Sequence, residues 1–248
     1  MAKESIKERL KRKKEELKSR SEMGDIVFLK DGDPKRVRIL NMGEENDFIK
    51  EVTQFYLGSE IKGVISPSTF GEPCAIMETY EELKNSEEDE DKELATKFSP
   101  RNKYLAFCAF YKDNAGKELD TNLSPRFVLL TSGLYQDIID LYLDEDEWGD
   151  MTDPEDGYDI KLSRSGKGMT DTEYSVNPCK PTRAPREFRN KVYDLDEEVR
   201  KIIPSYEETQ RLLDKFLGTN SDDEDDKPRK KKPVKKRPVK KRRTSDTD

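Results

Sequence analysis

Two arginines that alternate with apolar residues are the first residues in the sequence whose chemistry suggests a binding site. Arg36 and Arg38 are interleaved with Val37 and Ile39. In a β-strand, successive side chains point to opposite faces, so this spacing predicts two guanidinium groups leaving one face while the apolar pair enters the core. Two cations on one exposed face would suit an anionic ligand such as a phosphate.

Basic residues are also interleaved with aromatic residues on two other expected strands. Arg101 and Lys103 directly precede Tyr104, and an expected hairpin combines cations with a tyrosine. The hairpin residues are Lys161, Arg164, Lys167 and Tyr174. Single-stranded nucleic acid needs this mixture, because phosphates require cations and unstacked bases require flat aromatic surfaces. Taken singly, an aromatic residue in a strand is more typical of a core.

Composition excludes several kinds of catalytic site. The chain contains no histidine, so no triad, dyad or zinc site that needs an imidazole can form. Its cysteines, Cys74, Cys108 and Cys179, are irregularly spaced, and this spacing matches neither a disulfide framework nor a zinc ribbon. No phosphate-binding loop or pairing of a nucleophile with a base is evident. The sequence therefore predicts a protein that is not an enzyme and needs no cofactor.

Charge is distributed very unevenly along the chain. The net charge of −7 combines +5 in residues 1–20, −17 in residues 21–220 and +5 in residues 221–248. The basic C-terminal run could release counterions from a phosphate backbone without reading sequence. A solubility or targeting tail is the alternative interpretation. The acidic body counts against nucleic-acid binding, but a local positive groove can coexist with acidic loops.

The expected elements suggest a mainly β protein with inserted helices. Short β-branched and aromatic runs are separated by Gly, Pro and Asp turns. Strands are expected at 26–29, 36–40, 48–58, 61–66, 103–113, 126–130, 158–164 and 172–176, and helices from Thr79, at 133–143 and at 205–217. Both the Thr79 and the Ser205 helices begin with a capping-box pattern.

Three regions follow from these shifts in composition. Residues 1–24 form a basic N-terminal arm, residues 25–218 a core with an inserted helical lobe at 67–99, and residues 219–248 a tail expected to be disordered. No apolar run is long enough to span a bilayer, and the N-terminus is too charged for a signal peptide. We therefore expect an intracellular protein without a membrane partner.

The order of the motifs resembles one known family. RVRIL, STFGEPCAI before a helix, PRNKYLAFCAFYKD, GLYQDIIDLYL, DPEDGYDIKLSRSGKGMTDTEYSVNP and SYEETQRLLDKF follow one another between Arg36 and Gly218. In order and spacing they are similar to the single-stranded DNA-binding (helix-destabilising) protein family of T-even-type bacteriophages. The resemblance implies an OB-fold-like barrel core with inserted helices, and an electropositive cleft that holds single-stranded DNA without sequence preference.

Carried over by position, the resemblance implies a set of DNA-binding residues. They are Arg36, Arg38, Arg101, Lys103, Tyr104, Lys112, Lys161, Arg164, Lys167 and Tyr174. It further implies that Lys11, Arg12, Lys13 and Lys14 belong to an arm that docks on neighbouring protomers and makes binding cooperative. The implied setting is replication, recombination or repair of phage DNA in the cytoplasm of an infected bacterium, with replication or recombination proteins as further partners.

Two departures from the family pattern qualify that resemblance. The family's type member holds zinc through one His and three Cys, whereas this chain has Cys74 alone in the equivalent segment and no His. We therefore expect no zinc and a lobe held together by packing. The family's tail is acidic, but here SDDEDD precedes a basic run. A nucleoid or packaging protein that binds duplex DNA through this tail, or an acidic scaffold protein, remains an alternative.

Overall fold

The computed structural model describes residues 26–43, 46–58, 61–144, 146–167 and 171–221. The predicted cooperativity arm, with Lys11 to Lys14, and the basic run of the tail lie outside these residues. Within the described part of the chain, no helix has the length and apolar character needed to cross a membrane.

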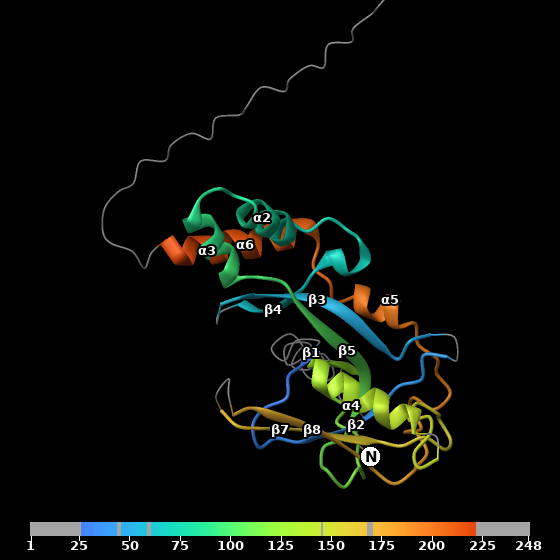
Figure 1. Ribbon diagram of the computed structural model, residues 1–248. Helices are drawn as coiled ribbons and strands as arrows, with labels where there is room; N and C mark the ends of the chain where they lie inside the picture. Colours follow the sequence, from blue (N-terminus) through green and yellow to red (C-terminus); the bar gives the residue numbers. More distant parts are fainter. Residues whose placement is uncertain (1–25, 44–45, 59–60, 145, 168–170, 222–248) are drawn as a thin grey trace, which may run out of the picture.

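The described chain is mainly β, with an OB-like core and inserted helices, as predicted (Figure 1). The strands are β1 (Ile26–Val27), β2 (Lys35–Ile39), β3 (Ile49–Leu57), β4 (Ile61–Ile65), β5 (Arg101–Phe110), β6 (Arg126–Leu130), β7 (Ile160–Ser165) and β8 (Glu173–Pro178). They form one sheet in the order β1-β6-β5-β2-β7-β8, and β3 pairs with both β5 and β4. Apart from the parallel β1–β6 pair, these pairings are antiparallel.

Strand β5 is the centre of the sheet. One edge pairs first with β3 and then with β2, and the other edge pairs with β6. Residues 105–110 are all buried, which confirms the prediction from their continuous apolar run. The first four residues of the strand are exposed or half-buried. The strand therefore anchors the core at one end and presents side chains near the surface at the other.

The two faces of β5 pack into different clusters. Ala106, Cys108 and Phe110 join the barrel interior, which also contains side chains from β2, β6 and β7. Helix α4 (Ser132–Leu143) covers this interior through Leu134 and Ile138. The intervening residues of β5 face a second cluster, against which α5 (Leu195–Arg200) packs. Alternation along one strand thus fixes which side chains can share a surface.

A lobe of helices lies over β3 and β4 at the top of Figure 1. It contains the 3₁₀ turn η1 (Pro67–Phe70) and helices α2 (Ala75–Lys84), α3 (Asp89–Lys97) and α6 (Tyr206–Ser221). Phe98 lies at its centre, with ring centroids 6.2 Å from Tyr80 and 5.5 Å from Phe216. The lobe is therefore a packed apolar cluster to which the C-terminal helix contributes.

One of the two predicted capping boxes is present. At α6, the amide of Ser205 donates to the Glu208 carboxylate at 2.9 Å and the amide of Glu208 donates to Ser205 Oγ at 3.3 Å. The prediction at Thr79 is wrong, because α2 begins at Ala75 and Thr79 lies inside it. The amide of Ala75 instead donates to the Thr209 hydroxyl of α6 at 3.3 Å, a tertiary contact that the local pattern does not contain.

Candidate nucleic-acid interface

The predicted basic and aromatic residues at the start of β5 lie on opposite faces of the strand. Tyr104 pairs with Glu51 of β3 and packs at the edge of the barrel interior. Lys103 pairs with Val52, which belongs to the cluster on the other face. Because successive side chains of a strand point to opposite faces, these two sequence neighbours lie on different faces of the sheet. A strand of DNA that contacts both must cross the edge of the sheet.

Tyr104 makes an aromatic stack with Tyr135 of α4. Their ring centroids are 4.1 Å apart and the rings are tilted by only 4°. Both side chains are half-buried. Tyr135 was not among the predicted site residues, although its position on the first turn of an amphipathic helix could have indicated it. The stack gives the interface a double aromatic surface held by a helix and a strand.

Lys103 lies in a less hydrated environment than an ordinary surface lysine. Burial lowers its pKa, and the neighbouring charge of Arg101 lowers it further. Arg101 itself is exposed at the first position of β5. A partly buried lysine beside a second cation favours the binding of an anion, because a phosphate would relieve the repulsion between the two charges.

The predicted hairpin residues Arg164 and Tyr174 do meet. They are opposite each other in the β7–β8 pairing, and the guanidinium carbon of Arg164 lies 6.0 Å from the centroid of the Tyr174 ring. Tyr174 is 37% exposed. The ring also borders a hollow formed with Asp137 and Asp140 of α4. This neighbourhood combines one cation and one exposed ring with acidic side chains that repel phosphate.

Arg36 and Arg38 do share one face of β2, but the face is covered rather than exposed. Arg38 is 0% exposed, and its Nε donates to Oδ1 of Asp159 at 2.8 Å. Its other nitrogens donate to the main-chain oxygens of Asp153, Gly157 and Thr182. The expectation that the Arg38 guanidinium projects from an exposed face of the strand is therefore wrong, because a distant carboxylate and loop carbonyls bind it inside the protein.

Arg36 is largely committed to the same carboxylate. Its Nε and Nη2 donate to Oδ2 of Asp159 at 2.9 and 2.7 Å, and Nη1 donates to the carbonyl of Ala115 at 2.9 Å. Burial alone would lower the pKa of Arg36, but the hydrogen bonds and charge of Asp159 raise it on balance. Gly116, at φ +70°, allows this approach because a Cβ there would collide with the Arg36 guanidinium.

The remaining predicted cations are dispersed. Lys161 is half-buried and opposite Arg36 in the β2–β7 pairing. Lys167 is exposed in the β7–β8 connection. Lys112 lies beyond the far end of β5, roughly 36 Å along the chain from Arg101 at about 3.3 Å per residue, and it pairs with Glu118. The predicted set therefore does not form one compact cluster.

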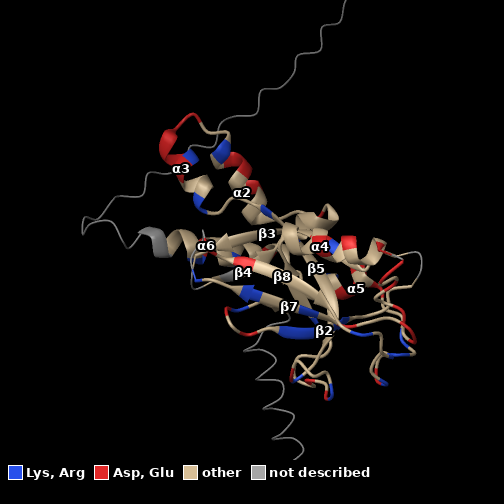
Figure 2. Cartoon of the chain, turned by 60° about the horizontal axis from the view of Figure 1, so that its bottom comes forward, with Lys and Arg blue, Asp and Glu red and all other residues tan. Residues whose placement is uncertain are grey.

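Figure 2 shows how charge is arranged over the fold. Blue segments mark β2 and β7 at the lower edge of the sheet, whereas red is concentrated on α3 in the helical lobe. The predicted cations therefore lie mainly on the sheet, and much of the acidic excess lies away from it. The cations of β2 are neutralised by acidic partners, however, because Lys35 pairs with Asp33 and both Arg36 and Arg38 pair with Asp159.

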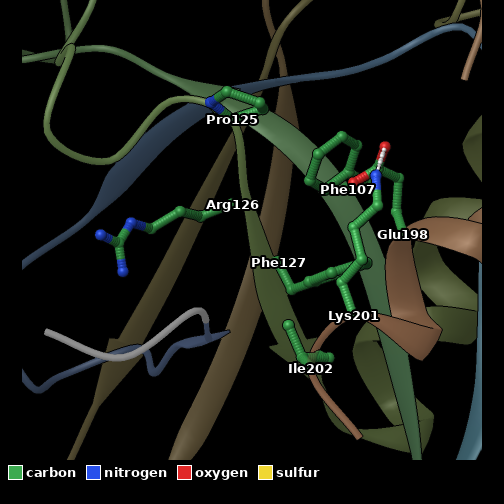
Figure 3. A pocket seen from close by; sticks show the side chains of 7 residues that line it. All are labelled: Phe107, Pro125, Arg126, Phe127, Glu198, Lys201 and Ile202. Carbon is green, nitrogen blue, oxygen red and sulfur yellow. Dashed lines mark hydrogen bonds and ion pairs between the residues drawn. The ribbon is translucent and has the colours of Figure 1, made fainter. Parts of the chain in front are cut away.

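A separate pocket of about 350 Å³ lies between α5 and strands β5 and β6 (Figure 3). Glu198 and Lys201 are joined there by an ion pair of 2.7 Å. The Arg126 side chain points away from this pair. None of the predicted DNA-binding residues lines the pocket, so we do not assign it to the candidate interface.

The described residues contain no group of three or more His, Cys, Asp or Glu side chains arranged to hold a metal ion. Cys74 is buried at the start of α2, packed against the apolar cluster of the lobe. The prediction that the protein needs no cofactor remains a prediction. Cys74 lies in the segment that the resemblance equates with the zinc-holding segment, and its side chain packs there with Ile76 and Phe98.

Comparison with known proteins identifies one family. The model of the family described as gp32 DNA binding protein like matches residues 31–217. This range includes every described strand except β1 and every residue of the predicted interface. No curated protein matches the sequence.

Proposed function

The chain belongs to the gp32 DNA binding protein like family, and we propose that it binds single-stranded DNA without sequence preference and coats it without catalysing a reaction. The family match is the observation that carries this proposal. The exposed or half-buried cations and tyrosines on β5, β7 and β8 support it, because they supply the two kinds of contact that single strands need.

In the proposed mechanism, cations neutralise phosphates while tyrosines stack on bases. Arg101 and Lys103 would supply charge at the start of β5, and Tyr104, backed by Tyr135, would supply an aromatic surface. Stacking contributes about 1–3 kcal/mol per base. Because the protein would bind single strands better than duplex, it would shift the melting equilibrium by mass action.

The biological setting is part of the same proposal. We propose roles in phage replication, recombination or repair inside an infected bacterium, with neighbouring protomers and replication or recombination proteins as partners. The N-terminal arm, with Lys11, Arg12, Lys13 and Lys14, would contact the neighbouring protomer. Its +5 charge in residues 1–20 is complementary to the acidic body, which supplies the attraction such docking needs.

A double substitution at the start of β5 tests the proposal. Lys103→Ala with Tyr104→Ala should weaken binding to oligo-dT, because both a phosphate contact and a stacking surface are lost. The slope of log K against log salt should become shallower by about 0.7, the contribution of one phosphate contact in a single strand. Trp148 and the ten tyrosines provide a fluorescence signal for the titration.

A matched control carries Lys92→Ala with Tyr206→Ala, which removes an exposed lysine and an exposed tyrosine from the helical lobe. Its affinity should equal that of the unmodified chain. Equal affinity of the β5 variant would exclude the proposed interface. Duplex binding as tight as single-strand binding, unaffected by the β5 substitutions, would instead favour the packaging alternative based on the tail.

A further inference from the structure

A basic segment lies outside the predicted interface. It was not identified from the sequence because it has neither the strand nor the helix periodicity. Residues 180–191, KPTRAPREFRNK, contain five Lys or Arg and a single acidic residue, Glu187. This is a marked local reversal in a body whose net charge is −17 over residues 21–220. We call residues 180–191 the basic strap.

The basic strap is held in place by main-chain hydrogen bonds. The amide of Thr182 donates to the carbonyl of Gly157 at 2.9 Å, and that of Ala184 donates to the carbonyl of Pro154 at 2.8 Å. Phe188 is 8% exposed and packs into the cluster on the outer face of the sheet. The segment is therefore a fixed surface despite its lack of regular secondary structure.

The basic strap forms one wall of a groove of about 500 Å³. The opposite wall is the loop that follows β5 and contains Lys117 and Glu118, and Tyr111 also lines the groove. Lys112, a predicted DNA-binding residue, pairs with Glu118 of that wall. The groove is thus continuous with the end of β5 that lies farthest from Arg101.

Cations outnumber acids along this groove. Lys117, Arg183, Arg186 and Arg189 line it, against Glu118 and Glu187. Glu118 pairs with Lys112, and Glu155 pairs with Arg183 and Arg189. Within the described part of the chain, Lys117 and Arg186 are exposed and make no ion pair. Their charges are available to an external anion.

The position of Arg189 is also fixed. Its Nε and Nη2 donate to the carbonyl of Ala184 at 3.2 and 2.9 Å, so the guanidinium spans the strap. Arg183 is 70% exposed and pairs with Glu155 only at the surface, where such pairs are weak. A phosphate could displace that pair at little cost.

We propose that this basic groove is a second contact for the phosphate backbone of single-stranded DNA, at the opposite end of β5 from Arg101 and Lys103. The inference rests on the proposed function and extends the DNA path across the sheet. A polyanion is the ligand that suits several separated cations on an acidic protein, because each cation can neutralise one phosphate and release counterions.

A triple substitution in the full chain tests the second contact. Lys117→Gln, Arg183→Gln and Arg186→Gln remove three exposed charges and leave the hydrogen bonds of Arg189 intact. Binding to oligo-dT is measured over a range of salt concentrations, with DNA in excess so that each strand carries one protein. The slope of log K against log salt should become shallower by about 2, from about 0.7 for each of three phosphates.

A charge-matched control carries Lys84→Gln, Lys92→Gln and Lys97→Gln, three exposed lysines of α2 and α3. It has the same net charge as the groove variant, so any general effect of charge appears in both. A slope for the groove variant equal to that of the control overturns the inference. That result would also follow if the groove were occupied by an acidic protein segment, including the chain's own SDDEDD run.

The two proposals fail in different ways. If the unmodified chain does not bind oligo-dT, the proposed function fails. If the unmodified chain binds but the Lys103→Ala, Tyr104→Ala variant binds equally tightly, the β5 interface fails. If binding is lost at β5 but the groove variant keeps the control's slope, only the second contact fails. Unchanged unfolding curves for both triple variants ensure that a shallower slope reports binding.

Discussion

Arg38 Nε donates to Asp159 Oδ1 at 2.8 Å in the protein interior, where the two side chains are 0% and 1% exposed. Oδ2 of the same carboxylate accepts two hydrogen bonds from Arg36. One carboxylate thus joins β2 to the start of β7 and neutralises two cations. Arg36, Arg38 and Asp159 therefore form a structural ion-pair network on the strand face that the sequence pattern assigned to DNA binding.

Replacing Asp159 with Asn should destabilise the protein severely. The substitution leaves Arg38 charged and buried without a counterion, and breaking one partner of a buried pair typically costs about 3–5 kcal/mol. Urea unfolding followed by Trp148 fluorescence measures the free energy of unfolding. Glu118→Gln, which breaks only the exposed pair with Lys112, should cost less than about 1 kcal/mol. Equal losses in the two variants would contradict the structural role of Asp159.

The pKa of Lys103 should make DNA binding sensitive to alkaline pH. Burial and then the charge of Arg101 lower this pKa, so the ammonium loses its proton at a lower pH than an ordinary lysine. Only the protonated form neutralises phosphate, and affinity for oligo-dT should therefore fall as pH rises through this pKa. The relevant range lies below the usual lysine pKa of about 10.4.

Lys103→Arg provides the comparison, because an arginine remains charged throughout that range. As pH rises toward the ordinary lysine pKa of about 10.4, the affinity of the variant should decline less than that of the unmodified chain. Parallel declines would mean that Lys103 does not contact the phosphate backbone.

Much of the fold could be predicted because its strands have strong local signals. The apolar run of β5, the β7–β8 hairpin and the amphipathic helix α4 all lie where their patterns indicated. The start of α2 could not be predicted in this way. Thr79 completes a capping pattern, but the apolar contacts of Cys74 and Ile76 with the lobe extend the helix one turn earlier.

The site was harder to predict because charge alone does not reveal exposure. Arg38 has the alternating pattern of a surface residue, and its burial depends on Asp159, 121 residues later in the chain. Lys103 and Tyr104 are neighbours in sequence and lie on opposite faces of β5. The basic strap lacks strand or helix periodicity, although a local charge count would have found it.

Phe98 should be essential for the stability of the helical lobe. It is 1% exposed and lies between Tyr80 and Phe216, so Phe98→Ala would leave a large cavity. Such a truncation typically costs about 3–5 kcal/mol. Tyr56→Ala, at a side chain that is 50% exposed, should cost far less.

A thermal midpoint that falls on addition of a zinc chelator to the unmodified chain would show instead that a metal supports the lobe.

Tyr174 should contact a base rather than a phosphate. Its exposed ring lies beside Asp137 and Asp140, which repel a phosphate but not an uncharged base. Tyr174→Leu should therefore weaken binding to oligo-dT by about 1–3 kcal/mol. The salt slope should stay unchanged, because no cation is removed. Tyr174→Phe keeps the aromatic face and should bind like the unmodified chain, so a loss of affinity with phenylalanine would argue against stacking and for a role of the hydroxyl.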